Sequence, residues 1–206
     1  SKYMNTATSY RDFRGVRMGI SDTSKAVEGS AARYSKPAFT ADSPMPVFYA
    51  AETYFLKAEA ALQGWIAGGD AAAKSYYEQG IQMSMSQYGV EIGDYLSSTV
   101  VPQGYTDRLN SKNNISFTSV PSVAWGDGTN KLQKIITQKW IANYPMGIEA
   151  WCDYRRTGYP ELFTARDNLS SAGYIGDIDS KRMVRRLPYP TTEKSSNSAN
   201  VEAAIA

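Results

Sequence analysis

Aromatic and polar side chains alternate along a long segment in the middle of the chain, residues 89–128. Aromatic rings stack on the apolar faces of sugars, and amide, guanidinium and carboxylate groups bind sugar hydroxyls. The ligand-binding candidates are therefore Tyr95, Tyr105 and Trp125, and the polar residues that accompany them are Asp107, Arg108, Asn110, Asn113, Asn114 and Asp127. The alternative is that these rings only pin the segment to neighbouring helices.

The sequence contains no recognisable catalytic centre. It has no histidine, which excludes the usual catalytic triads, most zinc sites and histidine acid–base chemistry. Acidic pairs such as Asp177 and Asp179 have the residue type for glycoside hydrolysis, but their separation in space is unknown. Asp94, Asp107 and Asp127 are too far apart in the sequence for a calcium loop, although folding can still assemble shared carboxylates. We therefore expect no enzyme, no cofactor and no metal.

The number and distribution of charged residues do not indicate a polyanionic binding partner. Twenty-two basic and 20 acidic residues give a net charge of +2, and the basic residues are dispersed, so we expect no nucleic-acid binding. Arg155 and Arg156 lie beside Trp151 and have the chemistry to hold an anion or stack on a sugar. A capped and packed helix end, with Asp153 paired to Arg156, is the preferred interpretation. Cys152, the only cysteine, is expected to be a buried structural thiol.

Helical periodicity predicts the elements that position these residues. A helix over 46–62 and another over 71–88, capped by Asp70, form a hairpin whose apolar positions recur every three or four residues. This hairpin resembles a tetratricopeptide unit, although Glu59 stands where a small residue is usual. Thr129 is expected to cap a helix that ends near residue 143. A helix over 147–156 then completes a second hairpin and stops at Gly158.

The predicted fold class is mainly α, with tetratricopeptide-like helical hairpins over 46–88 and 129–156 and long irregular loops. The 89–128 segment is too long for an ordinary connection and is expected to be either functional or poorly ordered. Residues 157–206 are expected to be mostly irregular, because each proline of the L-P-Y-P element disfavours helical angles at the residue before it.

Three motifs occur in order along the second half of the chain: ITQKWIANY at 136–144, EAWCDYRRTGYPELF at 149–163 and RRLPYP at 185–190. Together they resemble the C-terminal portion of SusD/RagB-family outer-membrane nutrient-binding lipoproteins. The last motif is similar to the RR-[LI]-P-Y-P-x-x-E-x-x-x-N-x-x-N pattern of SusD-like C-termini. The matching residues are Arg185, Arg186, Leu187, Pro188, Tyr189, Pro190, Glu193, Asn197 and Asn200.

The resemblance implies a helical protein of the SusD-like fold whose N-terminal half, with the lipid-bearing cysteine, is absent from this sequence. It implies a lipoprotein on the outer membrane of a Bacteroidetes-type cell, held to the membrane only through that lipid. The expected partners are an oligosaccharide or peptide nutrient and a SusC-like TonB-dependent transporter that imports it. The alternative is a helical-repeat adaptor that assembles proteins without holding a nutrient.

Overall fold

The computed structural model describes residues 4–5, 15–16, 18, 34–37, 39–107, 111–165 and 183–205. Over these residues the chain is mainly helical, as the periodicity predicted. The helices are α2 (Ala50–Leu62), α3 (Gly69–Gln87), α4 (Lys131–Ala142), α5 (Gly147–Thr157), α6 (Thr191–Ser196) and α7 (Ser198–Ile205), with short 3₁₀ helices η2 (Tyr95–Ser97) and η3 (Ser111–Asn113). One antiparallel strand pair joins β1 (Met4–Asn5) to β2 (Lys36–Pro37), with Met4 opposite Pro37.

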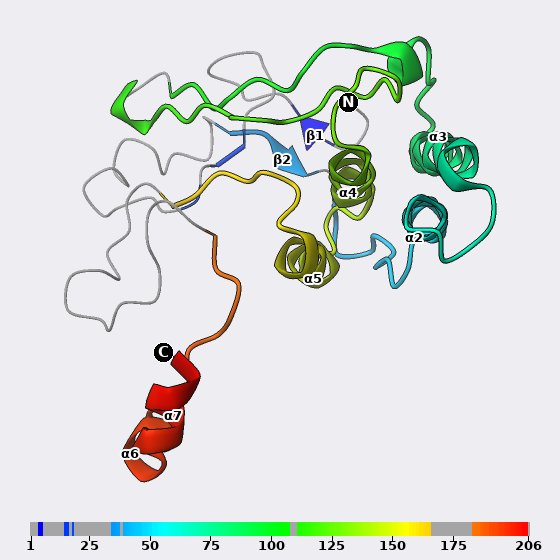
Figure 1. Ribbon diagram of the computed structural model, residues 1–206. Helices are drawn as coiled ribbons and strands as arrows, with labels where there is room; N and C mark the ends of the chain where they lie inside the picture. Colours follow the sequence, from blue (N-terminus) through cyan, green and yellow to red (C-terminus); the bar gives the residue numbers. More distant parts are fainter. Residues whose placement is uncertain are drawn as a thin grey trace.

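Helices α2, α3, α4 and α5 lie side by side with nearly parallel axes (Figure 1). The first two form the expected hairpin, and its tightest contact is between Gly80 of α3 and Phe55 of α2. A Cβ atom on Gly80 would lie 2.8 Å from the Phe55 ring, so only glycine allows the two helices to approach this closely. Tyr77 meets the same Phe55 ring edge-on at a centroid distance of 6.3 Å. The apolar core of the protein is built around this pair.

Three expected helix starts differ from the structure, the first because α2 begins at Ala50 and not at residue 46. Asp70 is the second residue of α3 and makes no cap, because its carboxylate instead accepts hydrogen bonds from Lys131 and from the Trp125 indole. The cap of α4 is Asn130, whose side chain accepts from the backbone N–H of Gln133 at 3.0 Å. The Thr129 hydroxyl is engaged elsewhere, since it donates to Asp127 at 2.7 Å.

The prediction for Cys152 was wrong, because its thiol is exposed. Ile148 on the same predicted apolar side of α5 is 73% exposed, whereas Asp153 is 5% exposed and faces the other helices. Helix α5 therefore packs through charged groups. Its end agrees with the prediction: Gly158 adopts a left-handed conformation, and Arg155 and Arg156 occupy the last turn.

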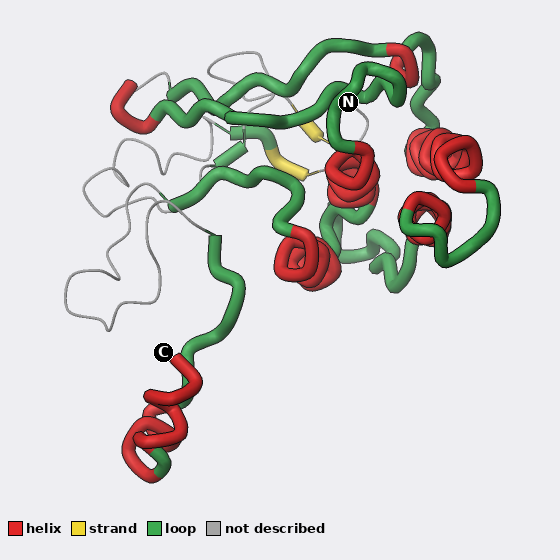
Figure 2. Tube along the Cα trace, in the orientation of Figure 1, coloured by secondary structure: helices red, strands yellow, loops and turns green. Residues whose placement is uncertain are grey.

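The two C-terminal helices lie apart from the four-helix group (Figure 2), whereas the segment of chain before them contacts α5, where the Trp151 indole donates to the Val184 carbonyl at 2.9 Å. Residues 183–190 are non-helical, and α6 and α7 then pack against each other. The tail is thus more helical than expected, because helix begins directly after Pro190, the last proline of the motif. None of the helices in the described part of the chain combines the length and the apolar character that crossing a bilayer requires.

Candidate functional site

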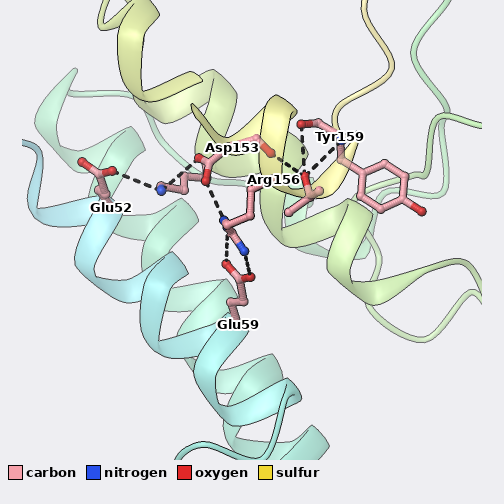
Figure 3. Close-up of polar contacts among 7 residues, drawn as sticks. Glu52, Glu59, Asp153, Arg156 and Tyr159 are labelled. Atoms are coloured by element: carbon pink, nitrogen blue, oxygen red, sulfur yellow. Dashed lines mark hydrogen bonds and ion pairs between the residues drawn. The ribbon is translucent and has the colours of Figure 1, made fainter. Parts of the chain in front are cut away.

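A chain of ion pairs, buried except at its Arg156 end, fixes α5 against α2 and α4 (Figure 3). Lys139 of α4 lies 3.2 Å from Glu52 of α2 and 2.9 Å from Asp153 of α5. Arg156 of α5 donates to both carboxylate oxygens of Glu59 on α2 and, at 3.1 Å, to Asp153. The hydrogen bonds to Glu59 raise the pKa of Arg156 above its usual range. The Asp153–Arg156 pair is therefore confirmed, and both residues are structural.

This network also sets the position of residues 158–165, which follow α5 directly. The Thr157 hydroxyl donates to the Asp153 carbonyl at 2.7 Å and accepts from the backbone N–H of Tyr159 at 3.1 Å, so the turn continues the ordered end of the helix. A cis peptide bond joins Tyr159 to Pro160. Residues 158–165 are the first wall of the candidate site.

The second wall comes from the 89–128 segment, which runs away from the helices past η2 to η3 and returns (Figure 1). Its two arms are joined near the helices by a hydrogen bond from the Ala124 N–H to the Ser98 carbonyl, at 2.9 Å. Farther out they are joined by a bridge between Tyr105 and Ile115. We call residues 98–124, which include both of these arms, the loop arm.

Glu161 ties the loop arm to the first wall. One carboxylate oxygen accepts from the Thr118 N–H at 2.8 Å and its hydroxyl at 3.0 Å, and the other accepts from the Ser119 N–H at 2.9 Å. Phe163 adds an aromatic contact, since it stacks on Phe117 at a centroid distance of 4.6 Å. Segments more than 40 residues apart in sequence are thus held together by both polar and aromatic contacts.

A cavity of about 380 Å³ lies between these two walls, and we call it the loop cavity. Half of its lining residues carry a hydroxyl group, and the full lining is Ile115, Ser116, Thr118, Ser119, Gln133, Tyr154, Gly158, Tyr159, Glu161, Leu162, Thr164 and Met183. Hydroxyl, amide and aromatic groups are the kinds that bind sugars. Among the described residues of this lining Glu161 is the one acidic residue, so these residues do not supply the pair of carboxylates that glycoside hydrolysis needs.

The loop arm is anchored at its base by a buried ion pair. Lys134 of α4, whose side chain has no exposed surface, lies 2.9 Å from Asp127 and donates to the Ser122 carbonyl at 2.7 Å. Burial disfavours the charged form of Asp127, but hydrogen bonds from Ser122, Thr129 and Lys134 outweigh burial and hold the pKa of Asp127 well below its usual range. Asp127 therefore anchors the loop arm to α4 in its ionised form.

The three aromatic candidates lie in different surroundings. Trp125 is 6% exposed and packs on Tyr77 at a centroid distance of 5.1 Å, so the ring presents no free face to a sugar. Tyr95 is half-buried against the core, and its hydroxyl shares a hydrogen bond with Gln138 at 3.3 Å. For these two rings the geometry matches the pinning interpretation.

Tyr105 lies at the other end of the segment, beside the loop cavity. It is half-buried, meets the Phe163 ring edge-on at 6.1 Å, and pairs with Ile115, which lines the cavity. The structure therefore does not gather the three candidates into one surface, and Tyr105 is the one that borders a polar cavity.

The polar residues predicted alongside them mostly brace the loop arm. Asn113 donates to the Asp107 carboxylate at 3.0 Å, and the Asp107 N–H donates to Asn114 at 2.8 Å. Arg108 and Asn110 lie outside the described residues, as do Asp177 and Asp179. Among the residues that the structure describes, no three His, Cys, Asp or Glu side chains converge in a way that could hold a metal ion.

Sequence reasoning missed Glu161 and the ion-pair network. Glu161 lies in a motif that was interpreted as a helix end, and only the fold brings it to the loop arm. The sequence did contain a local indication of the ion-pair network. Glu59 replaces a small residue on the buried side of its helix, and Lys139 shares a predicted apolar helix face with Ile135. Charged residues at such positions indicate buried partners.

A family model described as SusD-like, "Susd and RagB outer membrane lipoprotein", matches residues 1–206. Among curated proteins, none matches the chain. Solved structures of SusD homologues do match. One from Bacteroides vulgatus is 34% identical with a TM-score of 0.77, and one from Bacteroides uniformis is 36% identical with a TM-score of 0.78.

A structure described as a chitin-binding SusD homologue from Flavobacterium johnsoniae is 38% identical, with a TM-score of 0.76. In each of these three comparisons the match covers 98% of this chain but 42% of the solved chain. The chain therefore spans about two-fifths of the length of the structures it matches, and it has the SusD-homologue fold over that length.

Proposed function

Since the chain belongs to the SusD-like family of outer membrane lipoproteins, we propose that it captures glycans at the cell surface without catalysing a reaction on them. The observation that carries this proposal is the match along the whole chain to a chitin-binding homologue, at 38% identity. The loop cavity supports it, because hydroxyl, amide and aromatic groups line that cavity and its described residues include no pair of carboxylates.

The captured glycan is then delivered to a SusC-like TonB-dependent transporter in the outer membrane, and peptides are a further nutrient class. The family description supports the outer-membrane location, and the membrane contact is made through a lipid rather than through a spanning helix. Tyr105 is the ring we propose for glycan contact, because it lies at the border of the loop cavity. Tyr95 and Trp125 support the loop arm from the core side.

Isothermal titration with chitohexaose, with a neutral glucan hexasaccharide and with a peptide of similar length tests this proposal. We expect binding to at least one oligosaccharide, weakened at least fivefold by Tyr105→Ala, if a sugar on an aromatic ring contributes about 1–3 kcal/mol as a stacked nucleic-acid base does. Tyr76→Ala is the matched control, because Tyr76 is a half-buried ring on α3 outside the loop cavity.

Two results would count against the proposal. One is release of reducing sugar from any of these oligosaccharides, which would indicate a glycosidase. The other is the absence of binding to every probe combined with copurification of a stable protein partner that is not a transporter. That second result would favour the helical-repeat adaptor.

A further inference from the structure

A second cavity, of about 510 Å³, lies between α5, residues 183–189 and the two C-terminal helices. We call it the tail cavity. It adjoins the loop cavity, because Tyr154 and Met183 line both. A ligand long enough to fill the loop cavity would therefore reach the tail cavity at Tyr154.

The charge of the tail cavity is unbalanced. Arg185, Arg186 and Lys194 line it, and none of its lining residues is acidic. None of these three side chains forms an ion pair with a carboxylate in the described part of the chain, whereas Lys131, Lys134, Lys139 and Arg156 all do. Three cations that lack a carboxylate partner among the described residues, placed around one concave surface, favour an anionic ligand.

The two guanidinium groups are held in place by aromatic rings rather than by acids. Arg185 lies over the Tyr154 ring at 5.3 Å, and Arg186 lies over the Tyr189 ring at 4.7 Å and donates to its hydroxyl at 3.3 Å. Stacking on a ring leaves the edge of the guanidinium plane open, and the N–H groups not used by the Tyr189 hydroxyl can bind a carboxylate or sulfate there through parallel hydrogen bonds.

Lys194 distinguishes this chain from the general motif. Arg185 and Arg186 belong to the RR-[LI]-P-Y-P pattern, but Lys194 falls on one of its unspecified positions. The third cation is therefore a feature of this sequence and not of the pattern it resembles.

We propose that the tail cavity binds the carboxylate or sulfate group of an acidic saccharide, so that the glycan this protein captures carries a uronic acid or a sulfated sugar. The proposal rests on the glycan-capture function proposed above. The rings of Tyr154 and Tyr189 supply stacking surface for the sugar, and the three cations select its negative charge.

Titration of the protein with tetragalacturonate and with its fully methyl-esterified form tests the proposal, because esterification removes the negative charges and leaves the sugar backbone unchanged. We expect the acid to bind at least tenfold more tightly than the ester in 50 mM NaCl, and this preference to fall severalfold in 0.5 M NaCl. A sulfated galactose tetrasaccharide separates sulfate from carboxylate as the preferred group. Equal affinity for acid and ester, with the sulfated probe no tighter than the ester, would overturn the proposal.

Two variants and one control test whether the preference for the acid arises in the tail cavity. Lys194→Gln leaves the motif intact and is expected to reduce affinity for the acid about fivefold, and Arg185→Gln about tenfold, with no change for the ester. Arg155→Gln is the matched control, because Arg155 also stacks on a ring, that of Trp151 at 4.7 Å, but does not line the tail cavity. Equal losses in all three variants would indicate a general charge effect and refute the site, provided that circular dichroism shows each variant folded.

Further probes distinguish failure of the acidic subsite from failure of the proposed glycan capture. Binding of chitohexaose without any preference for acidic sugars would leave glycan capture standing and remove the acidic subsite. Failure of every saccharide to bind would remove both. Tighter binding of tetraglutamate than of tetragalacturonate would replace the saccharide by an acidic protein segment and overturn the inference.

Discussion

Replacing Lys139 by methionine should test the role of the buried charges most sharply. The Lys139 side chain is 4% exposed, and those of its partners Glu52 and Asp153 are 5% and 8% exposed. Methionine keeps most of the side-chain volume and removes only the cation. The variant therefore leaves two carboxylates buried, of which Asp153 retains Arg156 and Glu52 retains no side-chain partner among the described residues.

The expected loss follows from these contacts. Each pair contributes about 5 kcal/mol of gross attraction at an effective dielectric constant of about 20, and desolvation of the ammonium offsets a large part of it. Removing one partner of a buried pair costs about 3–5 kcal/mol, because the remaining charge is uncompensated. For a chain of this size that corresponds to a fall in melting temperature of roughly 10 °C.

Urea unfolding followed by circular dichroism measures this loss. Lys74→Met is the control, because the Lys74 side chain is 51% exposed and lies 3.7 Å from Glu78 on the helix surface, where a pair contributes less than about 0.5 kcal/mol. Glu52→Gln should destabilise the wild type but stabilise the Lys139→Met variant, since it then removes an orphaned charge. A loss below about 1 kcal/mol in Lys139→Met, or the same effect of Glu52→Gln in both backgrounds, would refute the reasoning.

Two further predictions concern packing and acid stability. Gly80→Ala should lower the free energy of unfolding by about 1–3 kcal/mol in thermal unfolding, despite the better helix propensity of alanine, because the new Cβ atom meets the Phe55 ring. Gly147→Ala is the control, since its Cβ atom meets no other atom within 4 Å. It should change the free energy of unfolding by less than about 0.5 kcal/mol. Asp127→Asn should cost about 2–3 kcal/mol at pH 7, because it leaves Lys134 buried without its counter-charge. Since the pKa of Asp127 is lowered on folding, its stabilisation is complete above the unfolded value of about 3.9 and is lost as pH falls below it. The difference between wild type and Asp127→Asn should therefore shrink below pH 4, and a difference that is constant from pH 7 to pH 3 would contradict this assignment.

Periodicity predicted the helices well because α2, α3 and α4 bury apolar faces. Phe55, Tyr77 and Ile135 are almost fully buried, as their spacing indicated. Helix α5 shows where the same reasoning fails. It packs through Asp153 and Arg156, so the apolar spacing of Ile148 and Cys152 marked its outer side instead.

The candidate site was harder to predict, because its walls come from segments far apart in sequence. Composition identified the 89–128 segment as unusual but did not distinguish Trp125, which fills the core, from Tyr105, which borders a cavity. Both are aromatic residues in a polar segment, and their different surroundings depend on how the loop arm folds back toward the helices. Glu161 has no local signal at all, since its partners Thr118 and Ser119 lie more than 40 residues upstream.

The exposed thiol of Cys152 is a site for selective chemical labelling within residues 1–206. No other cysteine exists in the sequence, so a maleimide dye or spin label would attach at one position on the outer side of α5. That position is two residues from Tyr154, which lines both cavities. A reporter there would sense ligands without any engineered mutation, and the same thiol would join two molecules covalently whenever the protein is kept under oxidising conditions.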